Sequence, residues 1–361
     1  MALQTRHISV QGYPWGWLHR YMLLLLLALL LFSTSTLHAS PRYRVIVMPS
    51  MSVPTITGQT AAFIKHLDRL GFRDQHNLDL QILHPQGDRS RARQLLSQAV
   101  ASKRPDLVVT SATLASQEAM DLLAEDQIPL LFMTVADPVG AGLVPALGQV
   151  NKRPISGRAN AVDRSILLDM VKRILTTPTK QRPIRIGLIH TDYPSAVGDA
   201  QLLEQVIASE PLITLEQIII PYQPIPKHLP MLQEHLIQAI QALEDRVDYW
   251  WSAHGPLADN DHYLSQFKQH SKHPMLFGID LKSVKRGALI HISPDMDAAG
   301  QEVAHLASAI LLGASPGEIP VAVPKQITMS INLATAIRMN LVIPSQMMEL
   351  AKGNLYHEVL P

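Results

Sequence analysis

The chain of 361 residues contains no cysteine. It therefore has no disulfides, no thiolate nucleophile, no zinc site built on thiolates and no cysteine that could carry a lipid at the start of a mature chain. An excess of either charge is also lacking, since 31 Lys and Arg residues are balanced by 30 Asp and Glu residues. Such a chain has no net field that would attract nucleic acid or an acidic membrane surface. We therefore expect no nucleic-acid partner.

Motifs for nucleotide, metal and hydrolytic chemistry are missing as well. No G-x-G-x-x-G follows an expected strand, and neither G-x-x-x-x-G-K-[ST] nor H-E-x-x-H occurs. The segment Gly313–Gly317 fits G-x-S-x-G, but an expected helix precedes its serine, where a nucleophile elbow needs a strand. His254 with His262, or His270 with His273, could meet in space, but neither pair has the i, i+4 spacing of helical metal ligands. We expect no enzyme, no cofactor and no metal site.

One long apolar run stands out near the N-terminus. Tyr21–Phe32 carries no charge, follows basic residues and precedes small and polar residues that end at Ala39. The run is shorter than the about 20 residues that span a bilayer, and this layout is typical of a secretory signal peptide. We expect a signal peptide over residues 1–39 and a periplasmic mature chain. An uncleaved N-terminal anchor is the alternative.

From Tyr43 onward, short apolar runs alternate with amphipathic stretches of helical period. Arg44–Met48, Leu107–Thr110 and Pro129–Val135 are expected strands, with expected helices between them. After a stretch rich in proline and glycine over residues 139–161, the alternation resumes with Ile184–Ile189. Strands that alternate with helices predict parallel sheets covered by helices on both faces. The expected fold class is α/β, with two consecutive doubly wound parallel-sheet lobes.

Small, hydroxyl-bearing or charged residues recur where the expected strands end. In open α/β sheets, ligands bind beyond the carboxyl ends of the strands. Several of these residues precede expected helices, whose free amides suit a carboxylate or another anion. The alternative for each serine or threonine is a plain helix cap. The candidate ligand-binding residues are Ser50, Ser52, Ser111, Thr113, Ala136 and Asp137 in the first half, and Asp192, Tyr193, Ser195, His254 and Asp280 in the second.

Three parts of the chain carry a family resemblance. Ile128–Phe132 leads into Asp137–Val144, Ser330–Ala336 is followed by Asn340–Pro344, and a helix is expected over Gly300–Leu312. These segments resemble the periplasmic substrate-binding proteins of ABC importers, in the family that includes tryptophan- and tyrosine-binding members. The resemblance extends from about Tyr43 to the C-terminus. It implies a type I periplasmic-binding fold, with two lobes joined by a hinge and a ligand enclosed by closure.

The same resemblance implies the domain limits and the function. On this plan, the first lobe takes residues 43–158 and 287–324, and the second takes 159–286 and 325–361. Asp137 would lie at the cleft edge of the first lobe, in a structural or a ligand-facing role. Tyr193 and His254 are candidates to flank a planar group of the ligand, or else to lie at the lid or surface.

The implied function is the extracytoplasmic solute-binding component of an ABC-type importer. A monomer would bind a small ligand, an amino acid or a related carboxylate, in the cleft and deliver it to an ABC permease in the inner membrane. The alternative is a periplasmic sensor subunit that signals ligand occupancy to a membrane-bound receptor. Repressors of this fold carry an N-terminal helix-turn-helix, where this chain has its expected export signal.

Overall fold

The computed structural model describes residues 42–160, 162, 164–175, 183–225, 227–323 and 325–360. The expected signal peptide over residues 1–39, and its alternative as an anchor, lie outside these residues. Within the described ranges, no helix is both long and apolar enough to span a bilayer. The described residues after Arg42 belong to one unit, in which the strands form two sheets. We call each sheet with its helices a lobe.

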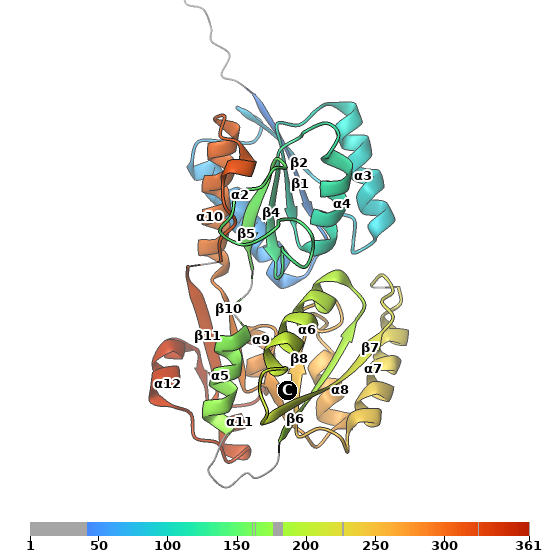
Figure 1. The fold of residues 1–361 in the computed structure, drawn as a ribbon, viewed down its shortest axis with the longest axis vertical. Helices are drawn as coiled ribbons and strands as arrows, with labels where there is room; N and C mark the ends of the chain where they lie inside the picture. Colours follow the sequence, from blue (N-terminus) through green and yellow to red (C-terminus); the bar gives the residue numbers. More distant parts are fainter. Residues whose placement is uncertain are drawn as a thin grey trace, which may run out of the picture. The chain divides into compact units, whose positions relative to one another are not determined.

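The sheet of the first lobe is entirely parallel, in the order β2-β1-β3-β4-β5 (Figure 1). Its strands are β1 (Tyr43–Pro49), β2 (Leu78–Ile82), β3 (Leu107–Ser111), β4 (Leu130–Val135) and β5 (Ile155–Ala159). The central strands are apolar on both faces, and Val45, Val47, Ile46 and Met48 are all fully buried. Such continuous apolar runs are typical of a parallel sheet covered by helices on both sides.

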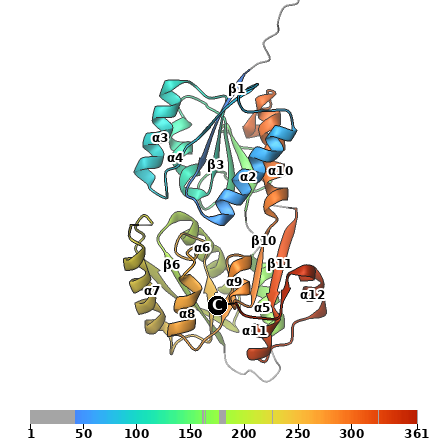
Figure 2. The same cartoon turned by 180° about the vertical axis from the view of Figure 1, so that it is seen from behind.

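Two helix layers cover this sheet. The helices are α2 (Pro54–Arg69) and α10 (Met296–Leu311) on one face, and α3 (Arg89–Ser102) and α4 (Thr113–Leu123) on the other. Figure 2 shows α2 and α10 side by side, although they are far apart in the sequence. Gly300 permits their close approach, because a Cβ there would lie 2.5 Å from the Cβ of Ala62. Asp295 caps α10 by accepting a hydrogen bond from the Ala298 amide.

The sheet of the second lobe has the order β12-β11-β10-β9-β8-β6-β7. Its strands are β6 (Ile184–Thr191), β7 (Ile213–Ile220), β8 (Tyr249–Ser252), β9 (Met275–Phe277), β10 (Ile290–Pro294), β11 (Ile327–Asn332) and β12 (Leu355–Tyr356). The strands pair in parallel except β10 with β11, which are antiparallel. The expected α/β class with two parallel-sheet lobes is confirmed, and the β10–β11 pair is an antiparallel addition to it.

Helices also cover both faces of the second sheet. On one face lie α5 (Arg164–Leu175), α6 (Pro194–Ile207), α11 (Leu333–Arg338) and α12 (Ser345–Ala351), and on the other lie α7 (Leu229–Leu243) and α8 (Tyr263–His270). The short helix α9 (Leu281–Lys285) lies beside β10 and β11 (Figure 2). The amide of the Asn332 side chain ties α9 to β11 by donating to the Val284 carbonyl over 2.8 Å.

The chain passes between the lobes after β5, after β10 and before β11. The sequence placed residues 287–294 in the first lobe, and this is wrong, because β10 pairs with β9 and β11 in the second sheet. Ile290 and Ile292 of β10 belong to the apolar core of the second lobe. After β10, the chain therefore returns to the first lobe only at α10. The other domain limits stay predictions.

Candidate functional site

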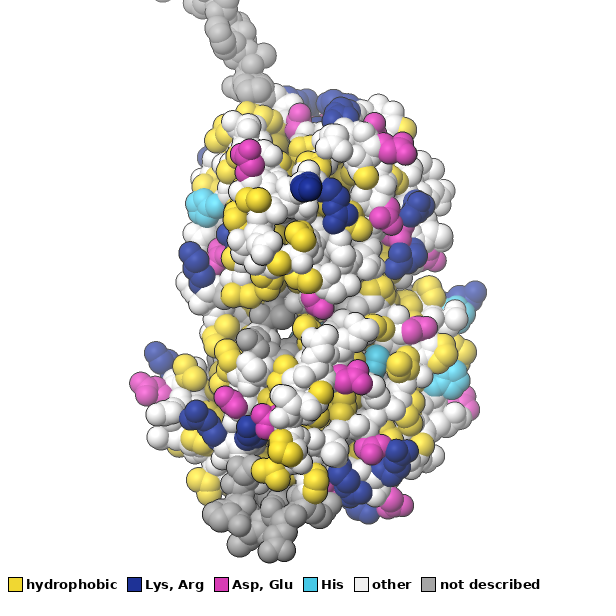
Figure 3. All heavy atoms as spheres, in the orientation of Figure 1, with side chains coloured by type: hydrophobic (Ala, Val, Ile, Leu, Met, Phe, Trp, Pro, Cys, Tyr) yellow, Lys and Arg dark blue, Asp and Glu magenta, His cyan; other side chains and the backbone are white. Residues whose placement is uncertain are grey.

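Two cavities lie between the lobes. The hinge-side cavity has a volume of about 810 Å³ and is lined by Thr55 and Gly58 of α2, by Asn160, and by His254, Asp280 and Ser293 of the second lobe, among others. The α4–α6 cavity has a volume of about 370 Å³ and is lined by Thr113, Gln117 and Asp137 of the first lobe and by Asp192, Ser195 and Gln201 of the second. Figure 3 shows the surface hollowed between the lobes. The structure thus brings six of the eleven candidate residues to these two cavities.

The α4–α6 cavity contains four of them. Thr113 is the first residue of α4 and is 4% exposed. Asp137 accepts a hydrogen bond from the Gly140 amide over 2.8 Å, so it closes its own turn while it lines the cavity. Asp192 accepts from the Tyr222 amide over 2.6 Å. The two carboxylates come from opposite lobes, and within the described residues neither forms an ion pair. The cavity therefore combines a helix N-terminus with two acceptors for a positively charged group.

The hinge-side cavity contains His254 and Asp280. The His254 amide donates to Asp199 over 2.8 Å, which holds the turn after β8 against α6. Asp280 caps α9 by accepting from the Ser283 amide over 2.7 Å. Both residues follow a strand of the second sheet, as the sequence predicted. One carboxylate oxygen of Asp280 is therefore already engaged in a hydrogen bond to its helix.

A polar ladder that was not predicted from the sequence lies in the wall of this cavity. His291 and Ser293 of β10 lie opposite Ser330 and Thr328 of β11. Burial lowers the pKa of His291, so the ring is neutral. Its Nδ1–H donates to the Gly278 carbonyl over 3.0 Å, and its Nε2 accepts from the Ser293 hydroxyl over 2.9 Å. The alternation of apolar and polar residues in both segments was the available signal.

Ser330 is the exceptional member of this ladder. It is fully buried and lines the cavity, and its hydroxyl has no hydrogen-bond partner among the described residues. A buried polar group without a partner costs about 1–3 kcal/mol, so such groups require an explanation. A ligand or water in the cavity would provide the missing partner.

Ser50 and Ser111 hold strand ends and do not line either cavity. The Ser50 hydroxyl accepts from the Ala115 amide over 3.1 Å, and the Ser111 hydroxyl bonds to that of Thr134 over 2.8 Å. Next to them, Ala112 has φ 76° and ψ 162°, which L-residues rarely adopt. Strain of this kind costs on the order of 1–3 kcal/mol and occurs at functional sites. The strained residue, Ala112, lies directly before the N-terminus of α4.

Ser52 and Ala136 line neither cavity. Ser52 is exposed, and Ala136 is half-buried at the end of β4. These two positions lie at strand ends, as the sequence indicated, but the structure brings neither into the lining.

Tyr193 packs between the lobes. It belongs to the second lobe and is 2% exposed, yet its side chain joins an apolar cluster of first-lobe residues that includes Met51 and Ile56. Its ring meets that of Tyr222 edge-on, with centroids 4.8 Å apart. Burial raises the pKa of Tyr193, and burial also raises the pKa of Tyr222 to about 12. Tyr193 lines neither cavity.

One titratable residue of this region was not predicted from the sequence. Asp259 lies in the loop after β8, and burial together with the charge of Asp280 raises its pKa to about 7.

No cluster of three or more His, Asp or Glu residues could hold a metal ion within the described ranges. At the G-x-S-x-G segment, α10 precedes Ser315, and a Cβ on Gly317 would lie 2.6 Å from the Asn151 carbonyl oxygen. This segment is a close-packed turn after a helix, as predicted.

Comparisons with known proteins agree with this architecture. A family model described as ABC transporter substrate binding protein matches residues 44–354. The chain is 26% identical over 271 residues to the "Tyrosine-binding protein" of Clostridioides difficile (strain R20291). The aligned segment covers 74% of this chain and 72% of the relative.

Solved structures share the fold. The ABC domain in complex with L-Trp from Streptococcus pneumonia has a TM-score of 0.72 and 20% identity, and covers 86% of this chain and 99% of that chain. A conserved domain protein from Vibrio cholerae O1 biovar eltor str. N16961 has a TM-score of 0.71 and 24% identity, with the same coverage of 86% and 99%.

Proposed function

Because the chain belongs to the ABC transporter substrate-binding protein family, we propose that it is the solute-binding component of an ABC-type importer. Proteins of this family bind substrates and are not enzymes, and they are typically extracytoplasmic. In our proposal the chain is exported by its N-terminal segment, works in the periplasm as a monomer, and delivers its ligand to an ABC permease in the inner membrane.

The observation that carries this proposal is the shared lining of the two cavities. Each cavity takes residues from both lobes, so a ligand bound there contacts both. A ligand that contacts both lobes favours the closed arrangement over the open one by its differential affinity. Closure of two lobes on a hinge is a recurring way to bury a ligand and present a changed surface to a partner.

We further propose an amino acid or a related carboxylate as the ligand. Thr113 and the N-terminus of α4 suit a carboxylate, because the helix dipole favours negative charge there. Asp137 and Asp192 suit an ammonium group, because they face the same cavity without an ion pair among the described residues. One relative is named a tyrosine-binding protein and one solved structure of this fold holds L-Trp, which supports an aromatic amino acid.

A thermal-shift screen tests the proposal. L-Tryptophan, L-tyrosine, other amino acids, simple carboxylates and sugars are added one at a time. A ligand at about a hundred times its dissociation constant adds about 2.7 kcal/mol of stability. We expect an amino acid to raise the melting temperature, and Thr113→Val and Asp137→Asn to reduce the shift. Ser52→Ala is the matched control, since Ser52 is exposed and lines neither cavity.

The outcomes separate the parts of the proposal. A shift with a sugar or polyol alone would overturn the amino-acid class and keep the solute-binding function. An amino-acid shift that survives in Thr113→Val and Asp137→Asn would move the site to the hinge-side cavity. A well-folded protein that responds to nothing in the panel would contradict the importer function and favour a sensor that acts through a protein partner.

A further inference from the structure

A third cavity lies in the second lobe alone, at the opposite ends of the strands from the cleft. We call it the distal pocket, and its volume is about 720 Å³. Tyr249 and Met275, the first residues of β8 and β9, line it, whereas His254 and Asp280 follow the other ends of these strands. Volumes of about 300–1,000 Å³ are typical of small-molecule sites. The distal pocket is therefore separate from the interlobe cavities and large enough for a small molecule.

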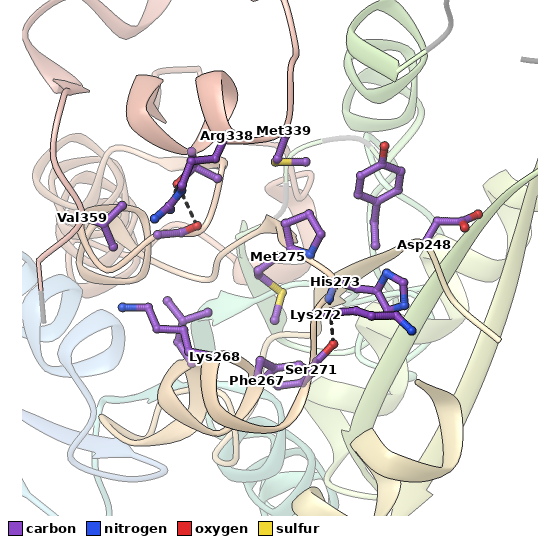
Figure 4. Close-up of a pocket in the computed structure, with 15 residues that line it drawn as sticks. Asp248, Phe267, Lys268, Ser271, Lys272, His273, Met275, Arg338, Met339 and Val359 are labelled. Carbon is purple, nitrogen blue, oxygen red and sulfur yellow. Dashed lines mark hydrogen bonds between the residues drawn. The ribbon is translucent and has the colours of Figure 1, made fainter. Parts of the chain in front are cut away.

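The middle of the distal pocket is apolar. Figure 4 shows Met275 and Phe267 between two polar ends of the pocket. Phe267 is 3% exposed and Met275 is 4% exposed, and Met339 of the segment after α11 adds a second thioether. Methionine side chains are flexible and polarisable, so they adapt to apolar ligands of different shapes. This surface suits the hydrocarbon or aromatic body of a ligand.

Two cations converge at one end of the pocket. Lys268 of α8 and Arg338 of α11 both reach over Gly287: a Cβ on Gly287 would lie 3.6 Å from Lys268 Cε and 3.7 Å from Arg338 Nη2. The Lys268 ammonium donates to the Leu360 carbonyl over 3.3 Å, and Arg338 donates to the Thr335 hydroxyl over 2.9 Å. Neither side chain forms an ion pair with a carboxylate in the part of the chain that the structure describes.

Among the described residues, no carboxylate therefore neutralises the charge at this end. Burial and the neighbouring charges of Arg338 and Arg286 lower the pKa of Lys268. At the other end of the pocket the charges are balanced, because Asp248 pairs with Arg185 over 3.2 Å and Lys272 lies 3.7 Å from Asp245. Two like charges held together favour an anion between them, and guanidinium groups bind carboxylates by two parallel hydrogen bonds.

We propose that the distal pocket binds a small organic anion, a carboxylate on an apolar body. Lys268 and Arg338 hold the carboxylate, and Phe267, Met275 and Met339 contact the apolar part. The site is distinct from the interlobe cavities, so its ligand does not compete with the transported solute for the same residues. The proposal does not depend on the function proposed above.

Methionine methyl NMR of the full chain tests this site with benzoate as the probe. The signals of Met275 and Met339 are assigned from Met275→Leu and Met339→Leu variants. Acetate, which lacks the apolar body, and benzyl alcohol, which lacks the charge, are the comparison ligands. We expect benzoate to shift both signals saturably, and the two comparison ligands to bind at least tenfold more weakly.

Charge variants complete the test. Lys268 and Arg338 are exposed, so Lys268→Gln and Arg338→Gln should fold normally and weaken benzoate binding by about tenfold each. Lys272→Gln is the matched control, because Lys272 lines the other end of the pocket. We expect less than a twofold change for it. Equal binding of benzyl alcohol, equal weakening by Lys272→Gln, or unchanged Met275 and Met339 signals would each overturn the proposal.

Discussion

Replacing Tyr193 by alanine should open the lobes without unfolding either of them. Tyr193 precedes α6 of the second lobe, but its ring packs into a first-lobe cluster that includes Met51 and Ile56. When the lobes separate, the ring leaves this cluster and meets water. The substitution therefore acts mainly on the equilibrium between closed and open forms. The contact between Tyr193 and Tyr222 joins two residues of the second lobe and is not expected to change on opening.

The size of the effect follows from burial. Tyr193 is 2% exposed in this structure, so nearly all of its apolar surface is removed from water. Full burial of a large apolar side chain is worth about 1.5–3 kcal/mol. Contact with Tyr222 keeps part of the ring covered after opening, so alanine should lower the closed-to-open ratio by at most roughly 10- to 150-fold. Tyr193→Phe is the matched control, because it keeps the ring and removes only a buried hydroxyl without a hydrogen-bond partner among the described residues.

The assay uses the absence of native cysteine. Ser97→Cys on α3 and Gln241→Cys on α7 place one exposed thiol on each lobe for spin labels. Pulsed EPR then measures the distance between the labels in the parent protein, Tyr193→Ala and Tyr193→Phe. We expect a longer main distance for alanine alone, with unchanged circular dichroism. An unchanged distance together with a lower melting temperature would refute the reasoning, since the ring would then stabilise the fold of a lobe.

Three further predictions concern stability, each measured by chemical denaturation. Since the folded pKa of Asp259 is raised to about 7 from 3.8, only the unfolded state releases this proton between these values. Asp259 should therefore contribute a fall of about 1.4 kcal/mol per pH unit to the free energy of unfolding as pH rises through this window, and Asp259→Asn should remove that contribution; an identical slope in parent and variant would contradict the assignment. Gly300→Ala should destabilise, because its Cβ would lie 2.8 Å from the Phe63 amide nitrogen and overpacking of about 1–3 kcal/mol exceeds the about 1 kcal/mol gained in helix propensity. Gly353→Ala, with no atom within 4 Å, is its control and should be nearly neutral. Ser330→Ala should stabilise the unliganded protein by about 1–3 kcal/mol by removing an unsatisfied buried hydroxyl, and a loss of stability would show that the hydroxyl has a partner.

The periodicity of the sequence determined the fold class. Apolar runs such as Arg44–Met48 and Ile184–Ile189 alternate with helical stripes, and this pattern depends on local geometry that each segment carries by itself. The family resemblance also lay in contiguous segments, which a family model now matches over residues 44–354. The position of the candidate residues at strand ends followed from the same periodicity, because these residues directly follow the expected strands in the sequence.

Only the tertiary structure decided which of these strand ends meet. The sequence of strand β10 is compatible with either lobe, and its pairing with β9 and β11 places the strand in the second lobe. Tyr193 was a candidate to flank a ligand or to lie at the lid or surface, and the packing of one lobe against the other buries its side chain in a first-lobe cluster. His291 and Ser330 are 39 positions apart by their numbering and become neighbours through an antiparallel pair. Each of these outcomes depends on contacts between residues distant in the sequence, which no local pattern specifies.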